Sequence, residues 1–103
     1  MNNNEKIALF QQLNRAESLR ISVVYDVLEQ CDAIKTNYVD YSTTHPVDCD
    51  TELLRLPTAD YDLCCALLTM LLMEDYSCNG RFQRRDRAGQ VKPIIERMIT
   101  LLK

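Results

Sequence analysis

Apolar side chains fill almost every position from residue 63 to residue 73, the longest such stretch in the chain. A helix that is apolar on nearly all of its faces is buried on most sides. The pattern therefore predicts a central buried helix at about residues 59–76, around which the other helices pack.

The two ends of this helix carry recognisable signals. Pro57 should end the preceding segment, and Thr58 is expected to cap the helix N-terminus. Asp60 and Asp62 then lie in the first turn, where the helix dipole favours negative charge. Gly80 can adopt the left-handed conformation that closes a helix, so the chain should turn there.

Helical spacing also marks the segments on either side. Apolar residues recur at steps of three and four within residues 4–36, which is the helix period, but the pattern leaves open whether one bent helix or two form, with Ser18 and Ser22 as break points. After Gly80, a short helix is expected at residues 83–88 and a last helix at residues 93–102.

The rest of the chain limits the architecture. Residues 37–57 are the least regular part and are predicted to form an irregular connector with about one short helical stretch. The chain has only two glycines and three prolines, fewer turn residues than a hairpin-rich β fold needs. We therefore expect a single all-α domain over residues 1–103, a compact bundle of four or five helices around the central one.

Composition bears on the cellular setting. The N-terminus lacks the basic and then apolar profile of a signal peptide, and no apolar run reaches the roughly 17–25 residues of a transmembrane helix. The five cysteines are odd in number and do not suggest a disulfide framework. These features favour a cytoplasmic protein that does not associate with membranes.

Charge is unevenly distributed along the chain. Residues 1–77 contain 5 Lys and Arg against 13 Asp and Glu, whereas residues 78–103 contain 7 against 2. The basic excess is concentrated in a cluster that also holds an aromatic residue: Arg81, Phe82, Arg84, Arg85 and Arg87. Such asymmetry is typical of a nucleic-acid surface, an acidic partner site or internal neutralisation.

Two interpretations of this cluster compete. Its arginines could bind phosphates while Phe82 stacks on a base, which would make the protein nucleic-acid-binding. The acidic remainder of the chain would repel a polyanion, and Glu74 and Asp75 are available to pair with Arg81, Arg84 or Arg85 across the turn. Structural ion pairs or a protein partner are therefore favoured over nucleic acid.

Residues typical of catalysis or metal binding are scarce. The chain has one histidine, His45, which lies near Cys49 in the connector, but neither belongs to a paired metal-binding spacing. Cys78 follows a helix end near Arg81, where a cation could activate a thiol, whereas Cys64 and Cys65 suit the core. No catalytic motif is present, so enzymatic activity is not favoured, and no metal or cofactor is expected.

A leucine-rich helix that ends in an acidic pair and an aromatic residue is followed here by an Asn-Gly turn, another aromatic residue and a Gly-x-Val…Ile-Ile helix. In this pattern, residues 60–102 resemble the C-terminal part of a family of small uncharacterised bacterial proteins. The resemblance implies a helical fold and a bacterial, cytoplasmic origin. It rests on residues 67–72, Glu74, Asp75, Tyr76, Cys78, Asn79, Gly80, Phe82, Gly89, Gln90, Val91 and residues 94–99.

The function that the sequence favours is a non-enzymatic interaction or regulatory role. The partner would be another protein or a second copy of the chain, because the acidic and basic halves could pair between molecules. Five tyrosines could contribute an aromatic binding surface or could border the core: Tyr25, Tyr38, Tyr41, Tyr61 and Tyr76.

Overall fold

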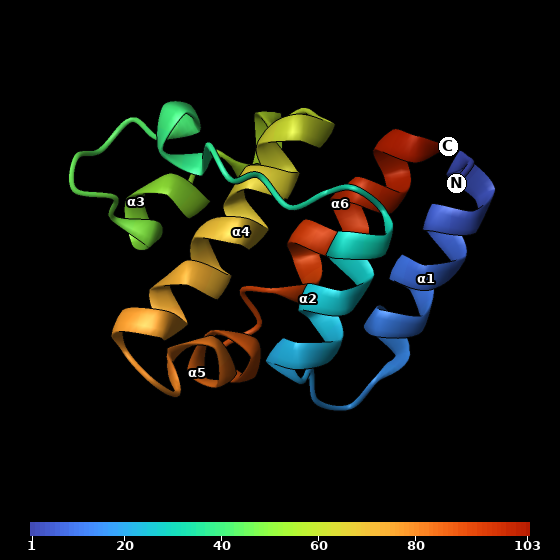
Figure 1. The fold of residues 1–103 in the computed structure, drawn as a ribbon, viewed down its shortest axis with the longest axis horizontal. Coiled ribbons are helices and arrows are strands. Elements are labelled where there is room, and N and C mark those ends of the chain that lie inside the picture. Colours follow the sequence, from blue (N-terminus) through green and yellow to red (C-terminus); the bar gives the residue numbers. More distant parts are fainter.

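The predicted central helix is present as α4, Tyr61–Ser77, in a computed structural model that describes all 103 residues (Figure 1). Every residue from 64 to 72 is buried, including Thr69, whose hydroxyl donates to the carbonyl of Cys65 (2.8 Å). The helix is therefore the hub of the hydrophobic core, and the all-α prediction is confirmed: the chain forms six α-helices and no strand.

The N-cap of α4 was predicted two residues too early. Thr58 belongs to a separate 3₁₀ turn, η2 (Leu56–Thr58), and the chain is extended at Ala59. The cap is Asp60, whose Oδ1 accepts a hydrogen bond from the backbone N–H of Leu63 (2.8 Å).

Two helices, not one, precede the connector: α1 (Asn3–Arg15) and α2 (Ile21–Gln30). The backbone is extended at Ala16 and again at Arg20, which separates them. Helix α1 begins with a capping box between Asn2 and Glu5 and lies along α6, so that the two chain termini meet (Figure 1).

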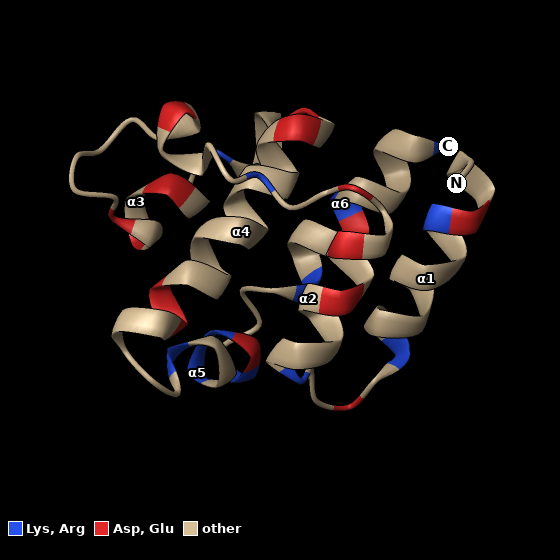
Figure 2. Cartoon of the chain, viewed as in Figure 1, with Lys and Arg blue, Asp and Glu red and all other residues tan.

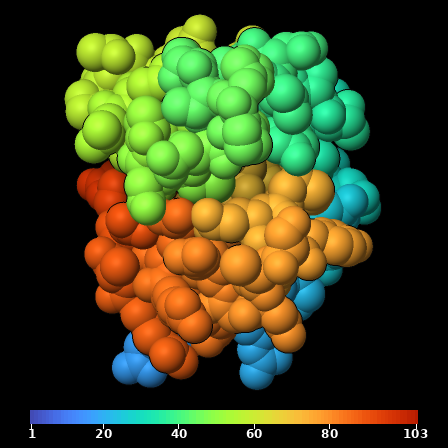
Figure 3. Space-filling model, turned by 90° about the vertical axis from the view of Figure 1, so that its left-hand side faces the viewer, coloured from blue at the N-terminus to red at the C-terminus, as the bar shows by residue number.

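The connector is more ordered than its sequence suggested. It contains the 3₁₀ helix η1 (Tyr38–Tyr41) and the short helix α3 (Cys49–Leu53). Glu52 of α3 is fully buried, and its carboxylate accepts hydrogen bonds from the backbone N–H groups and hydroxyls of Thr43 and Thr44, at 2.6–3.2 Å. Seen from one side, the connector forms the upper half of the surface, above the end of α4 and α5 (Figure 3).

The last two helices are α5 (Arg81–Arg87) and α6 (Lys92–Leu102). Gly80 has the predicted positive φ, +89°, and starts α5, while Gly89, at +73°, separates α5 from α6. Helix α6 contributes Ile94, Ile95, Met98 and Ile99 to the core against α4. None of the helices combines the length and the hydropathy needed to cross a membrane.

Candidate functional site

The fold buries some members of the arginine cluster and leaves others exposed. Arg85 is only 5 % exposed, and its guanidinium binds the carboxylate of Glu74 twice, Nε to Oε1 at 2.6 Å and Nη2 to Oε2 at 2.8 Å. Its Nη1 also donates to Asp50 (2.8 Å) and to the side-chain carbonyl of Gln90 (3.0 Å). Arg85 thus joins α3, α4 and α5 and is not free to bind a partner.

This network changes the acidity of its members. The hydrogen bonds to Glu74 and Asp50 raise the pKa of Arg85, even though burial acts in the opposite direction. The hydrogen bonds and charge of Arg85 lower the pKa of Glu74 and of Asp50. All three groups are therefore charged at neutral pH, as a structural ion-pair network requires.

The second acidic residue at the end of α4 has a different role from the one predicted. Asp75 pairs with no arginine; its Oδ1 accepts hydrogen bonds from the backbone N–H groups of Gly80 (3.1 Å) and Phe82 (3.0 Å). It therefore caps α5 from outside that helix, which satisfies N–H groups that have no partner within the helix.

Phe82 lies in the core. Its exposed fraction is 0 %, so its ring cannot stack on a base in this structure. Arg81 is half-buried, whereas Arg84 and Arg87 are exposed. None of the three forms an ion pair: the cations of the four ion pairs in the protein are Lys35, Arg55 and Arg85.

The fold brings further basic residues to the same end of the molecule. Arg15 ends α1 and Arg20 precedes α2, and both helix ends lie on the side of the protein that α5 occupies (Figure 2). The loop between them is tied to that side, because the backbone N–H of Leu19 donates to Asp86 on α5 (2.9 Å). Four exposed arginines and one exposed carboxylate, that of Glu17, lie at this end, which we call the basic end. The arginines are Arg15, Arg20, Arg84 and Arg87.

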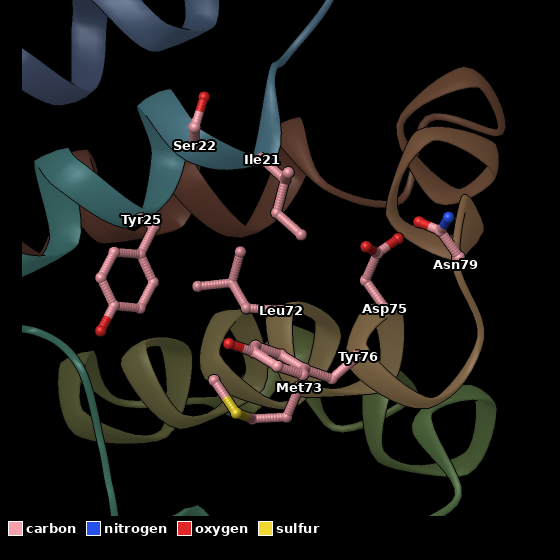
Figure 4. Close-up of a pocket in the computed structure, with 8 residues that line it drawn as sticks. All are labelled: Ile21, Ser22, Tyr25, Leu72, Met73, Asp75, Tyr76 and Asn79. Carbon is pink, nitrogen blue, oxygen red and sulfur yellow. The ribbon is translucent and has the colours of Figure 1, made fainter.

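A separate surface feature lies between α2 and the last turns of α4. It is an open, mainly apolar groove of about 870 Å³, which we call the α2–α4 groove (Figure 4). It is lined by Ile21, Ser22, Tyr25, Leu72, Met73, Asp75, Tyr76 and Asn79.

Two exposed aromatic side chains border the groove. Tyr76 is 89 % exposed and Tyr25 is 39 % exposed, although both border apolar residues. Leu72 is buried beneath them, and Ile21 and Met73 are half-buried (Figure 4). The tyrosines were the only members of this surface that the sequence marked as candidates for binding.

The histidine and the cysteines do not form a common site. His45 is exposed, whereas Cys49 is buried, and its thiol is directed to the backbone carbonyl of Met70 (3.9 Å). Burial raises the pKa of the Cys49 thiol to about 12. Burial also raises the pKa of Cys64 to about 11 and that of Cys65 to about 12. No group of three or more His, Cys, Asp or Glu side chains is arranged to hold a metal ion.

No family model matches the chain, and neither a curated protein nor a solved structure is significantly similar to it. Two surfaces of the protein carry exposed groups that a partner could contact: the α2–α4 groove and the basic end.

Proposed function

We propose that this protein is a non-enzymatic interaction module of the bacterial cytoplasm, which binds a protein partner in the α2–α4 groove. The observation that carries the proposal is the exposure of Tyr76 and Tyr25 at the border of an apolar groove. The bacterial and cytoplasmic setting is part of the proposal and rests on the sequence pattern of residues 60–102 alone.

The composition of the groove favours a protein partner. Tyrosine is enriched in protein interfaces, where its ring supplies apolar area and its hydroxyl tolerates water. A partner that covered Tyr76 would remove from water an aromatic side chain that the fold itself leaves almost wholly exposed. Anchors of this kind contribute most of the binding energy in many interfaces.

Site-specific photo-crosslinking tests this proposal. A photoreactive phenylalanine analogue at position 76, introduced into the protein in its native cells, should give a crosslinked adduct of defined mass. The matched control is the same analogue at Ala8, which is exposed on α1 and does not line the groove. An adduct of twice the 11.9 kDa chain mass would identify a second copy as the partner. No adduct at position 76, or equal adducts at both positions, would contradict the proposal.

A second candidate function is nucleic-acid binding at the basic end. The observation in its favour is that Arg15 and Arg20 lie at the same end as Arg84 and Arg87, so the exposed positive charge does not depend on Arg85 or Phe82. Four free guanidiniums can contact phosphates without reading a base sequence.

Binding of a labelled single-stranded oligonucleotide, followed by fluorescence anisotropy at several salt concentrations, tests this second function. Affinity should fall steeply as salt increases and should be lost in the Arg84→Ala/Arg87→Ala variant. The absence of binding at low salt, or binding that this variant retains, would exclude the basic end as a nucleic-acid site.

A further inference from the structure

The α2–α4 groove has an acidic border on its α2 side. Asp26 and Glu29 lie one helical turn after Ser22 and Tyr25, so they extend the groove-facing side of α2. Both are exposed, and neither forms an ion pair with any residue of the chain. Their charges are therefore available to a partner that lies along the groove.

The α4 side of the groove is negative as well. Asp75 uses only Oδ1 to cap α5, and its second carboxylate oxygen has no hydrogen-bond partner within the chain. Figure 4 shows this carboxylate between Ile21 and Asn79, at one end of the groove. The partial negative charge at the C-terminal end of α4 is offset by the N-terminal end of α2, where Ile21 lines the same groove, so the carboxylates decide its charge. No Lys or Arg lines the groove.

An apolar floor with acidic borders fits one kind of partner segment. Amphipathic helices bind in apolar grooves through side chains spaced three, four and seven residues apart, while their polar flanks meet the groove borders. Here the floor of Ile21, Leu72 and Met73 would take the apolar side chains. Carboxylates on both sides would select lysine and arginine on the flanks and would disfavour acidic segments.

We infer that the occupant of the α2–α4 groove is an amphipathic helix of another protein, with an apolar face bordered by lysine and arginine residues. The inference rests on the proposed function and adds the chemistry of the partner. It places the acidic residues Asp26, Glu29 and Asp75 opposite the partner's cations, with Tyr25 and Tyr76 against its apolar face.

A second copy of the chain fits this groove less well. The exposed arginines of α5 have no exposed apolar neighbour on that helix, because its only large apolar side chain, Phe82, is buried. The apolar face of α6 is likewise packed in the core, apart from Leu101, which is 40 % exposed. The same acidic borders would repel the phosphates of a nucleic acid, so this surface and the basic end select different partners.

The charge preference can be measured with two designed peptides of about 15–20 residues, long enough to form helix in water. Both carry the same leucine and alanine face with one tryptophan; their polar positions are lysine in one peptide and glutamate in the other. The protein contains no tryptophan, so tryptophan emission reports only on the peptide. We expect a blue shift on binding and at least about tenfold tighter binding of the lysine peptide at low salt, with the preference reduced by added salt.

Charge reversal at the groove border provides the decisive variant. Asp26→Lys/Glu29→Lys should abolish or reverse the preference between the two peptides, and both positions are exposed, so the fold should tolerate the change. The matched control, Glu17→Lys/Asp40→Lys, changes the net charge from −3 by the same amount at exposed positions outside the groove and should keep the preference.

The possible outcomes separate the inference from the function on which it rests. Equal binding of both peptides, or a preference that the two double variants change equally, would overturn the inference. If the crosslink at position 76 still formed in that case, the groove would remain a protein-binding site for a segment of different chemistry. A crosslinked adduct consisting of two copies of the chain would also overturn the inference, whereas no adduct at all would overturn the proposed function.

Discussion

The guanidinium of Arg85 and the carboxylate of Glu74 form two parallel hydrogen bonds, at 2.6 and 2.8 Å, across the turn that joins α4 to α5. This arrangement uses the planar shape of arginine, which lysine cannot reproduce. It neutralises a carboxylate at the C-terminal end of α4, where the helix dipole disfavours negative charge. The most basic segment of the sequence is thus partly committed to the fold.

Replacement of Arg85 should therefore be costly, unlike replacement of its neighbour. We expect Arg85→Ala to lower the free energy of unfolding by about 3 kcal/mol, because Glu74 would stay largely buried without its partner. Arg84→Ala, at an exposed position without an ion pair, should change it by less than about 0.5 kcal/mol. Urea denaturation at neutral pH compares the two variants; equal losses would contradict the structural role assigned to Arg85.

The contribution of Glu52 to the free energy of unfolding should be lost in acid. Burial favours a higher pKa for this carboxyl group, but hydrogen bonds from Thr44, Arg55 and Thr43 outweigh it and lower the pKa to about 2. Because the folded pKa lies below the ordinary value of 4.5, the stabilisation is fully present above that value and is lost as the pH falls towards 2.

The Glu52→Gln variant isolates this contribution. At pH 7 it should be less stable by roughly 1–3 kcal/mol, because an amide cannot accept all of the hydrogen bonds that the carboxylate accepts. The difference from the wild type should shrink between about pH 4.5 and pH 2 in urea titrations. A difference that stays constant over this range would show that ionisation of Glu52 does not contribute.

The N-terminus of α4 offers a matched pair of capping variants. Asp60→Ala removes the side-chain acceptor for the N–H of Leu63 and should cost about 1 kcal/mol. Thr58→Ala removes only a long hydrogen bond to the carbonyl of Arg55 (3.4 Å) at an exposed position. It should lower the free energy of unfolding by only a few tenths of the loss expected for Asp60→Ala. Thermal unfolding of both variants tests the assignment, and a larger loss for Thr58→Ala would reverse it.

The thiols should differ sharply in reactivity. Cys78 is exposed, whereas Cys31, Cys49, Cys64 and Cys65 are buried, and burial raises the pKa of each of these four. An alkylating reagent at neutral pH should modify one cysteine in the native protein and all five after denaturation, as counted by intact mass. Rapid modification of a second site in the native protein would contradict the burial of these thiols.

The helices could be predicted from the sequence because their signals are local. The burial of α4 follows from its own apolar run, and the short α5 follows from a few neighbouring side chains. The positive φ of Gly80 follows from the absence of a side chain on that residue. The cap of α4 was misplaced because Pro57 and Thr58 form a 3₁₀ turn of their own, so the helix begins two residues after the position that proline and threonine usually indicate.

The candidate sites were harder to predict because they depend on contacts between distant segments. The pairing of Glu74 with Arg85 was among the predicted pairs, since the intervening turn brings the two together. Burial of Phe82 was not predicted, because one aromatic residue among arginines shows no apolar periodicity. The groove unites residues near positions 21–25 with residues 72–79, and nothing in either segment alone indicates the other.

The most direct test of groove binding is a titration of the isotopically labelled protein with the lysine-rich amphipathic peptide, followed by amide chemical shifts in two-dimensional NMR spectra. Binding in the α2–α4 groove predicts the largest changes at residues 21–29 and 72–79, on the two sides of the groove, and much smaller changes with the glutamate peptide. Changes confined to α5 and the ends of α1 and α2, or no change with either peptide, would contradict it.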